Sequence, residues 1–305
     1  MSRALAVEAF ASPSRRLPDW LRKTIAVGRE AARTDALLKT LGLHTICESG
    51  RCPNRDECYS QKTATFMVMG DVCTRSCGFC SVSTGRPDAL DAGEPERVAE
   101  AARRLGLEHV VVTSVNRDDL PDEGVFHFVR VIEELKKISD AIVIEILTPD
   151  FRRTQTDAVR ALLEAGPDIF NHNVETVPGL YRRVRPQGDY ERSLGLFRAI
   201  RKHSGTVLTK SGLMLGLGET RDEVLAVLED LRRAGCDILT LGQYLQSSSA
   251  GLPVAEYIHP EVFEGWKARA REMGFTWVES APFVRSSFHA KESFSRLRAV
   301  LKERN

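Results

Sequence analysis

The sequence lacks the features that mark several large protein classes. No apolar run approaches the ~20 residues needed to span a bilayer, and the opening MSRALAVEAFASPSRRLPDW soon breaks into Arg and Pro, so no secretory leader is visible. The net charge of +1 shows neither the basic excess typical of nucleic-acid binding nor the acidic excess of a solvated tail. No internal repeat or low-complexity linker is present. We therefore expect a cytoplasmic globular protein with one large domain and extensions, or two ordinary domains.

Apolar β-branched runs alternate with amphipathic segments from about residue 63 onward. Six runs have the continuous apolar character of buried parallel strands: 63–70, 109–115, 141–148, 168–175, 206–215 and 237–242. Helices are expected between them, as at 95–105, 126–138 and 220–235. In the last helix Thr220 and Glu223 form a predicted capping box and Gly235 a stop. The pattern predicts an α/β fold, a partial (β/α)6 TIM-like barrel, and leaves a doubly wound sheet open.

The two ends of the chain do not follow this repeat. Residues 1–60 hold a polar start, one helix-like segment at 28–42 and the stretch CESGRCPNRDEC. Residues 281–305 read as an appended tail with a basic helix. We predict three parts: an N-terminal extension at 1–60, a barrel at 61–280 and a C-terminal tail at 281–305.

Six of the seven cysteines fall into two triplets, Cys47-x4-Cys52-x5-Cys58 and Cys73-x3-Cys77-x2-Cys80. In a reducing compartment, clustered cysteines more often hold metal or perform redox chemistry than form disulfides. Four extended residues reach at most ~14 Å, so the second triplet must lie in one compact loop that can surround a metal centre. The ~50 Å that the intervening segment can span means that the two triplets need not share a site.

The spacing of the cysteines favours iron over zinc. Structural zinc requires four Cys or His ligands, and two widely spaced Cys-x2-Cys pairs are absent. The second triplet also differs from the ferredoxin spacings. Three thiolates on a four-iron cluster leave one iron open to a substrate or cofactor. This triplet directly follows the first predicted strand, and barrel active sites collect on such loops. A binding module with structural zinc is the non-enzymatic alternative.

The second triplet, with Phe79 before its last cysteine, resembles the cluster loop of radical S-adenosylmethionine enzymes. The resemblance implies that Cys73, Cys77 and Cys80 hold a 4Fe-4S cluster. Its open iron would chelate the methionine moiety of S-adenosylmethionine, and reductive cleavage would yield a 5'-deoxyadenosyl radical. No catalytic side chain beyond the cluster ligands is expected.

Longer segments resemble one family within this superfamily, the lipoyl synthases. They are CESGRCPNRDEC, ATFMVMGDVCTRSCGFCSVSTGRP, VVTSVNRDDLPDEG (111–124), FNHNVETV (170–177), RRVRP (182–186), TKSGLMLGLGE (209–219), LGQYLQ (241–246) and VRSSFHA (284–290). The resemblance runs from about Trp20 to Ala290. The chain departs from the family pattern at Phe288, Ser247 and Gln187.

The resemblance implies a second, auxiliary 4Fe-4S cluster in the N-terminal extension. Cys47, Cys52 and Cys58 would hold it, and Ser287 of the tail would be its fourth ligand, with Ser286 pointing elsewhere. The implied reaction inserts sulfur from this cluster at the sixth and eighth carbons of a protein-bound octanoyl-lysine. It would use two molecules of S-adenosylmethionine per lipoyl group.

Several partners follow from the same resemblance. The substrates would be octanoylated lipoyl carrier domains, namely the E2 subunits of 2-oxoacid dehydrogenases and the glycine cleavage H protein. A flavodoxin or ferredoxin would supply electrons, and an iron–sulfur carrier would rebuild the auxiliary cluster. Neither nucleic acid nor membrane is expected. The alternative is another radical enzyme that inserts sulfur into a small molecule, as biotin synthase does.

Four polar residues are predicted contacts of S-adenosylmethionine: Ser114, Asn173, Glu175 and Arg185. The first three lie where predicted strands end, which is where barrels bind ligands, although Asn173 and Glu175 could instead cap the next helix. The fork of Arg185 suits a carboxylate.

Two other motifs have structural interpretations. GLMLGLGE lacks the last glycine of a phosphate-binding loop, because residue 221 is Arg, and we expect a tight strand-to-helix turn. Cys236, in AGCDIL, is expected in the core.

Overall fold

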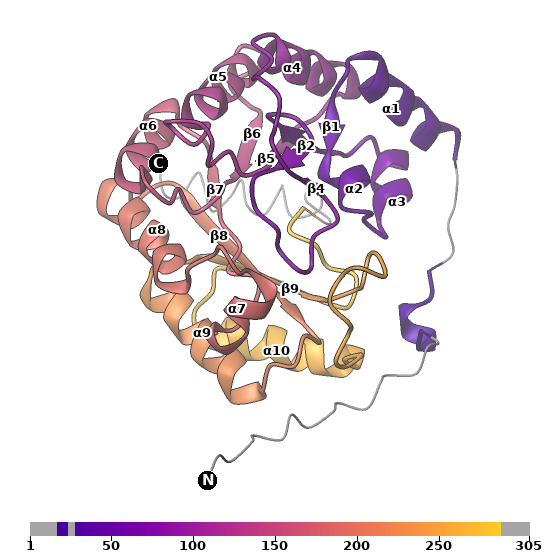
Figure 1. Ribbon diagram of the computed structural model, residues 1–305, viewed down its shortest axis with the longest axis vertical. Coiled ribbons are helices and arrows are strands. Elements are labelled where there is room, and N and C mark those ends of the chain that lie inside the picture. Colours follow the sequence, from indigo (N-terminus) through magenta and orange to yellow (C-terminus); the bar gives the residue numbers. More distant parts are fainter. Residues whose placement is uncertain (1–16, 24–27, 288–305) are drawn as a thin grey trace.

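The computed structural model describes residues 17–23 and 28–287. Its main sheet has the order β1-β2-β5-β6-β7-β8-β9-β10, and every neighbouring pair is parallel except β1 and β2. The parallel strands are β2 (Thr65–Val68), β5 (His109–Ser114), β6 (Val143–Leu147), β7 (Ile169–Asn171), β8 (Leu208–Leu215), β9 (Ile238–Gln243) and β10 (Trp277–Ser280). The sheet curves into a partial barrel (Figure 1).

Helices surround the strands as an outer ring (Figure 1). They are α4 (Glu94–Leu105), α5 (Val125–Lys136), α6 (Gln155–Ala165), α8 (Tyr190–His203), α9 (Arg221–Arg233) and α10 (Pro260–Glu272). The predicted capping box opens α9, since the Thr220 side chain accepts from Glu223 N–H and the Glu223 side chain accepts in return. Gly235 follows this helix with φ +93°, which suits a glycine stop.

The N-terminal segment adds α1 (Arg29–Thr40), β1 (His44–Thr45), α2 (Ile46–Ser49) and α3 (Arg55–Ser60). Strand β1 pairs antiparallel with β2, with His44 opposite Met67. In the order of the sheet, β1 and β10 are its two edges, so within the described residues the barrel is open rather than closed.

The predicted partial barrel is confirmed, and it has one more parallel strand than the six apolar runs. Those runs became β2 and β5 to β9. Strand β10 escaped prediction because Trp277, Val278, Glu279 and Ser280 alternate between half-buried and buried positions and lack a continuous apolar character.

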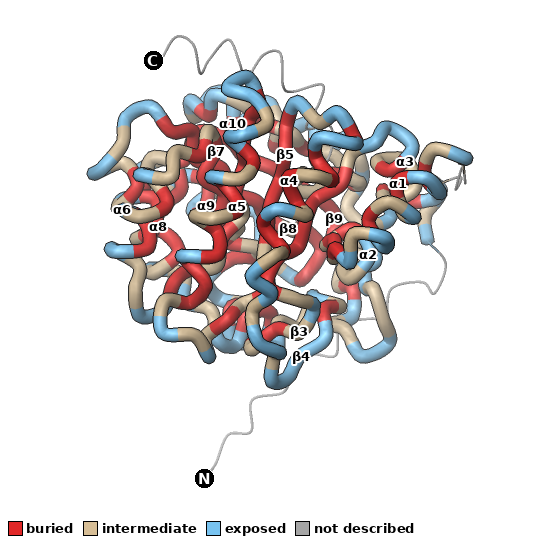
Figure 2. The backbone as a smooth tube through the Cα atoms, turned by 90° about the horizontal axis from the view of Figure 1, so that it is seen from above, coloured by how far each residue is buried: buried red, intermediate tan, exposed pale blue. Residues whose placement is uncertain are grey.

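Buried residues concentrate in the strands and in the inward faces of the helices (Figure 2). One core cluster includes Phe128 and Ile132 of α5 and Phe170 of β7, and a second joins α9 and α10 to β8, β9 and β10. Cys236 is fully buried in the second cluster, as predicted. No helix among the described residues is both long and apolar enough to cross a membrane.

Charged residues also occupy the interior of the sheet. Lys210 Nζ of β8 lies 2.8 and 3.1 Å from the two carboxylate oxygens of Glu145 on β6, and Asn171 Nδ2 donates to Glu145 Oε1 at 2.8 Å. Burial opposes ionisation of Glu145, but Lys210 and His109 outweigh it and lower the pKa of that carboxyl to about 2. The ion pair is therefore intact at neutral pH.

Candidate cluster and cofactor site

A cavity of about 780 Å³ lies at the carboxyl ends of the parallel strands. All residues predicted from the sequence to hold a cluster or S-adenosylmethionine line it: Cys47, Cys52, Cys58, Cys73, Cys77, Cys80, Ser114, Asn173, Glu175, Arg185 and Ser287. The structure thus brings together candidates that are up to 240 positions apart in the chain, between Cys47 and Ser287. Both cysteine triplets therefore line the same cavity.

The second triplet lies in a loop with a small sheet of its own at its base. Strands β3 (Val72–Cys73) and β4 (Ser83–Thr84) pair in parallel, with Cys73 opposite Thr84. This small sheet lies at one end of the molecule, and its β4 residues are exposed (Figure 2). Because β3 and β4 flank residues 74–82 and pair with each other, they hold the two ends of this loop together.

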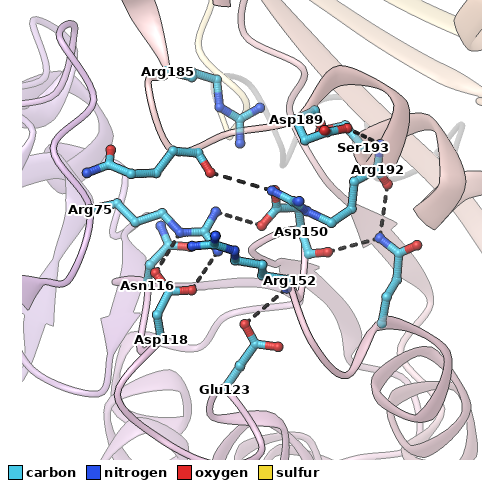
Figure 3. A network of polar contacts seen from close by, with 12 residues as sticks. Arg75, Asn116, Asp118, Glu123, Asp150, Arg152, Arg185, Asp189, Arg192 and Ser193 are labelled. Atoms are coloured by element: carbon cyan, nitrogen blue, oxygen red, sulfur yellow. Dashed lines mark hydrogen bonds and ion pairs between the residues drawn. The ribbon is translucent and has the colours of Figure 1, made fainter. Parts of the chain in front are cut away.

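An ion-pair network fastens this loop to the barrel (Figure 3). The buried Arg75 makes a bidentate pair with Asp118, with both N–O distances 2.7 Å, and a third bond to Asp150 Oδ1 at 2.6 Å. Arg192 donates to the other oxygen of Asp150 at 2.7 and 2.9 Å. Asp118 and Asp150 follow β5 and β6, so the loop is tied to the ends of two strands.

Gly78 fixes the middle of the same loop. Its N–H donates to Val184 O at 2.9 Å, and its carbonyl accepts from Leu252 N–H at 3.0 Å. A Cβ at this position would lie 2.9 Å from the Leu252 side chain and 3.0 Å from Arg183 O. Only glycine allows both segments to approach this closely.

The thiols of the second triplet suit iron ligands. Cys73 Sγ accepts hydrogen bonds from the N–H of Arg75 at 3.4 Å and of Asn116 at 3.3 Å, which fix the position of the sulfur. Burial raises the pKa of Cys77 to about 12, and the nearby Cys80 and Cys73 add to this while Arg185 opposes it. A metal must therefore displace a firmly held proton.

The first triplet is carried by short elements of the N-terminal segment. Cys47 lies in α2, Cys52 in the loop after it and Cys58 in α3, and Cys52 N–H donates to Cys47 O at 3.0 Å. Burial raises the pKa of Cys47 to about 11 and that of Cys58 to about 12, and electrostatic repulsion from other thiols of the triplet contributes to both. The three thiols are near enough to influence one another.

No three Cys, His, Asp or Glu side chains in the described ranges converge on a single-ion site.

The tail folds back over the first triplet. Asn54 Nδ2 donates to Phe283 O at 2.7 Å, joining positions 229 apart, and Lys23 Nζ donates to Asn54 Oδ1 at 2.6 Å. The tail crosses the end of β9 at Gly242, where a Cβ would lie only 2.1 Å from Val284 O. These contacts bring Ser287 to the cavity. Phe288 lies outside the described residues.

Ser286 has partners of its own. Its Oγ accepts from Asn173 Nδ2 at 2.8 Å, and its carbonyl accepts from Lys210 Nζ. Ser286 was expected to point away from the first triplet. Its contact with Asn173, a predicted cofactor residue, was not foreseen. Substituting it would therefore not leave the site undisturbed.

The cofactor side of the cavity holds polar atoms without partners. Ser114 Oγ, Asn116 Oδ1, Thr148 Oγ1 and Asn173 Oδ1 are buried, line the cavity and have no hydrogen-bond partner in the described structure. Buried polar atoms are nearly always satisfied in folded proteins. Their clustering indicates a polar ligand.

Glu175 and Arg185 frame this side. Glu175 has φ +67°, an uncommon conformation for a residue with a side chain, and its N–H donates to Gly212 O at 3.0 Å. Burial raises the pKa of its carboxyl, against the influence of Arg185 and a hydrogen bond from Asn173 Nδ2. Arg185 donates from one nitrogen to Asn173 O at 2.8 Å.

The glycine-rich segment after β8 forms a turn, as expected. Gly216 and Gly218 have φ of +97° and +109°. The carboxylate of Glu219 accepts from the N–H groups of Gly216 and Leu217. The backbone donors that a phosphate would need are therefore already used.

Sequence comparison assigns the chain to a family. A family model for the radical SAM superfamily matches residues 67–240, and one for the N-terminal domain of lipoyl synthase matches residues 7–52. The lipoyl synthase of Caldanaerobacter subterraneus subsp. tengcongensis is 52% identical over 93% of this chain and 99% of that protein. The lipoyl synthase of Nitrosococcus oceani is 54% identical over 90% and 85%. The chain belongs to the lipoyl synthase family.

Solved structures agree on the fold. Methylornithine synthase superposes with a TM-score of 0.54 at 14% identity, covering 90% of this chain and 96% of that one. The FeFe-hydrogenase maturase HydG from Carboxydothermus hydrogenoformans gives 0.57 at 16% identity, covering 78% and 56%. This lipoyl synthase family member is thus a radical SAM enzyme with a TIM-like partial barrel.

Three residues of the site were not predicted from the sequence. Arg75 and Lys210 depend on partners from distant strands, so no local pattern identifies them. Arg285 lines the same cavity as Cys52 and Glu175. The only available signal was the position of Arg75 inside the second triplet.

Proposed function

We propose that this chain inserts two sulfur atoms into an octanoyl group carried on a lysine of a lipoyl carrier domain. The observation that carries the proposal is the single cavity lined by both cysteine triplets and Ser287. A reaction that needs a radical and a sulfur donor at the same carbon requires both centres to face one space. The division into an extension, a barrel and a closing tail is part of the proposal.

Each triplet has a separate role in this proposal. Cys73, Cys77 and Cys80 would hold the radical SAM cluster, and Cys47, Cys52, Cys58 and Ser287 would hold an auxiliary 4Fe-4S cluster. When bound, the radical SAM cluster supplies an electron for cleavage of S-adenosylmethionine, and the auxiliary cluster supplies sulfur. Acid–base side chains cannot perform this chemistry on an unactivated C–H bond.

The residues of the barrel would bind and orient S-adenosylmethionine. Asn173 and Ser114 offer the buried Oδ1 and Oγ atoms that lack partners. Arg185 holds Asn173 through its carbonyl, and the φ of +67° at Glu175 points to a backbone held for binding. The roles of these four residues are supported by burial and by their shared cavity.

The tail would control the auxiliary site. A serine oxygen is a harder ligand than a thiolate and suits iron less well, so Ser287 is the point where that cluster would open. Lys210 and Asn173 hold the neighbouring Ser286 by its carbonyl and hydroxyl. They would thereby position Ser287 without touching the cluster.

Three classes of partner belong to the proposal. The carrier would be an E2 subunit of a 2-oxoacid dehydrogenase or the glycine cleavage H protein. A flavodoxin or ferredoxin would reduce the enzyme, and an iron–sulfur carrier would rebuild the auxiliary cluster.

The proposal is tested by anaerobic reaction of the reconstituted enzyme with an octanoylated carrier domain. Mass spectrometry should show a lipoyl group and 5'-deoxyadenosine. Replacing Cys47, Cys52 and Cys58 with Ala should remove the lipoyl product and keep 5'-deoxyadenosine formation. Sulfur insertion into a small molecule in preference to the carrier would contradict the proposal and favour a reaction like that of biotin synthase.

A further inference from the structure

Two arginine pairs lie on adjacent loops at the carboxyl end of the barrel. Arg152 and Arg153 follow β6, and Arg182 and Arg183 belong to α7 (Tyr181–Val184), which follows β7. Strands β6 and β7 are neighbours in the sheet, so these loops leave it side by side. All four side chains are exposed.

Within the described part of the chain, none of these arginines forms an ion pair. Arg153 and Arg183 each donate to a backbone carbonyl instead, of Leu120 at 2.6 Å and of Leu217 at 2.8 Å. Pro149 precedes the first pair and Arg185 follows the second, and both line the cavity. The four arginines therefore lie within two to four positions of residues that line the cavity.

Two carboxylates close to the first of these loops are occupied by other partners (Figure 3). Asp150 binds Arg75 with one oxygen and Arg192 with the other. The Glu123 carboxylate accepts from the backbone N–H groups of Arg152 at 3.0 Å and Arg153 at 2.9 Å. Glu123 therefore binds the backbone of this loop and forms no ion pair with the guanidinium group of Arg152 or Arg153.

Several arginines of the outer helices are paired with carboxylates. On α4, the adjacent Arg103 and Arg104 both bind Glu100, at 2.9 and 2.6 Å. Arg198 of α8 pairs with Glu191 and Arg233 of α9 with Asp230. Unpaired arginine pairs at the mouth thus contrast with a neutralised pair on the surface of the ring.

We propose that Arg152, Arg153, Arg182 and Arg183 dock an acidic protein surface next to the lysine that carries the octanoyl group. This inference rests on the proposed function and adds the chemistry by which the carrier is recognised. Planar guanidinium groups match carboxylates in a bidentate geometry, and unpaired charges at a rim steer an oppositely charged partner to the opening.

The surroundings favour a protein over a membrane or a nucleic acid. The exposed large hydrophobic residues of the described structure are Leu17, Trp20, Phe126 and Val262, and none lies on these two loops. The loops therefore offer no apolar side chain to insert into lipid and no aromatic ring to stack on bases. The net charge of +1 provides no general attraction to polyanions.

The test compares an acidic carrier domain with a short neutral octanoyl-lysine peptide. In R152Q/R153Q/R182Q/R183Q, calorimetry should show about tenfold or greater weakening of carrier binding at low salt, and a flatter salt dependence. The KM for the carrier should rise with kcat unchanged, and turnover of the peptide should stay at the wild-type value. The R103Q/R104Q variant, which changes an adjacent pair on α4, should bind carrier normally.

Several results would overturn the docking proposal. They are unchanged carrier binding in the fourfold variant, an equal loss of peptide turnover, and tighter binding of anionic vesicles or single-stranded DNA than of carrier through the same arginines. The fourfold Lys variant should retain the salt dependence, because charge is preserved. If wild-type enzyme bound the carrier through these arginines but produced no lipoyl group, the proposed function would fail while the docking site stood.

Discussion

The two cysteine triplets face one cavity, but the molecule holds them by different means. The loop of the second triplet is held to the barrel by several strong contacts. Arg75 binds Asp118 and Asp150 after β5 and β6, and both the N–H and the carbonyl of Gly78 form backbone hydrogen bonds. The first triplet lies on the short helices α2 and α3 and on the loop between them. Remote segments are joined to it by individual contacts, such as the hydrogen bonds from Asn54 to Phe283 O and from Arg51 to Ser247 O and the ion pair of Lys23 with Glu57.

This difference matches the two tasks that we assign to the triplets. A centre that generates radicals in every turnover must keep its geometry, and buried ion pairs at the strand ends provide it. A centre that gives up sulfur must open and be rebuilt. Individual hydrogen bonds contribute only about 0.5–1.5 kcal/mol each, so a tail held by a few of them can be released without unfolding the barrel.

The largest effect is expected from removing the second triplet. Replacing Cys73, Cys77 and Cys80 with Ala should abolish 5'-deoxyadenosine formation and leave the other triplet loaded. Iron and sulfide counts should fall from about eight to about four of each per chain, if each triplet builds one four-iron cluster. Continued cleavage of S-adenosylmethionine by this variant would contradict the assignment.

A large effect on stability is expected inside the barrel. Lys210→Met leaves Glu145 buried without its counter-charge and should lower the free energy of unfolding by about 3–5 kcal/mol. The double variant Glu145→Gln/Lys210→Met should recover most of this loss, because no uncompensated charge remains. Urea denaturation of the wild type and of both variants measures these free energies of unfolding. Equal stability of the single and double variants would show that the ion pair does not act as described.

A moderate effect is expected at the centre of the second loop. Gly78→Ala places a methyl group 2.9 Å from the Leu252 side chain and 3.0 Å from Arg183 O, which should cost about 1–3 kcal/mol. Because residue 78 lies between Cys77 and Cys80, 5'-deoxyadenosine formation should fall with stability. Gly265→Ala is the control, since nothing lies within 4 Å of a Cβ there. Equal behaviour of the two variants would refute the close approach.

The smallest effect is expected where the tail is fastened. Asn54→Ala removes the donor to Phe283 O and should reduce stability by about 1 kcal/mol. Hydrogen exchange should show faster exchange around residues 281–287, with 5'-deoxyadenosine formation unchanged. Asn54→Asp, which also lacks the donor but keeps an acceptor for Lys23, should expose the tail in the same way. Unchanged protection in both variants would mean that other contacts hold the tail.

The fold was predictable from the sequence where apolar runs were long and continuous. Runs such as HVVVTSV and AIVIEILT identified β5 and β6, and Thr220, Glu223 and Gly235 marked the ends of α9 correctly. The short strands β1, β3 and β4 have two residues each, too few to show any period. These strands form only because they pair with other segments, and a local sequence pattern cannot predict that pairing.

The candidate site was predictable to the extent that it lay in compact motifs. Cysteine spacing and the resemblance to a family drew attention to residues that share one cavity. Arg75, Lys210 and Arg285 could not be found in this way, because their surroundings come from distant parts of the chain, such as Asp150 for Arg75 and Glu145 for Lys210. The contact of Ser286 with Asn173 likewise depends on how the tail crosses Gly242.

The central claim is that one cavity holds a radical-forming centre and a separate sulfur-supplying centre closed by Ser287. It is tested most directly by measuring 5'-deoxyadenosine and lipoyl product together in Ser287→Ala under a strong reductant. The account predicts continued 5'-deoxyadenosine formation and loss of the lipoyl product. Ser286→Ala should show the other pattern, with altered cleavage of S-adenosylmethionine, because Ser286 touches Asn173. Lipoyl product at the wild-type rate in Ser287→Ala would contradict the account.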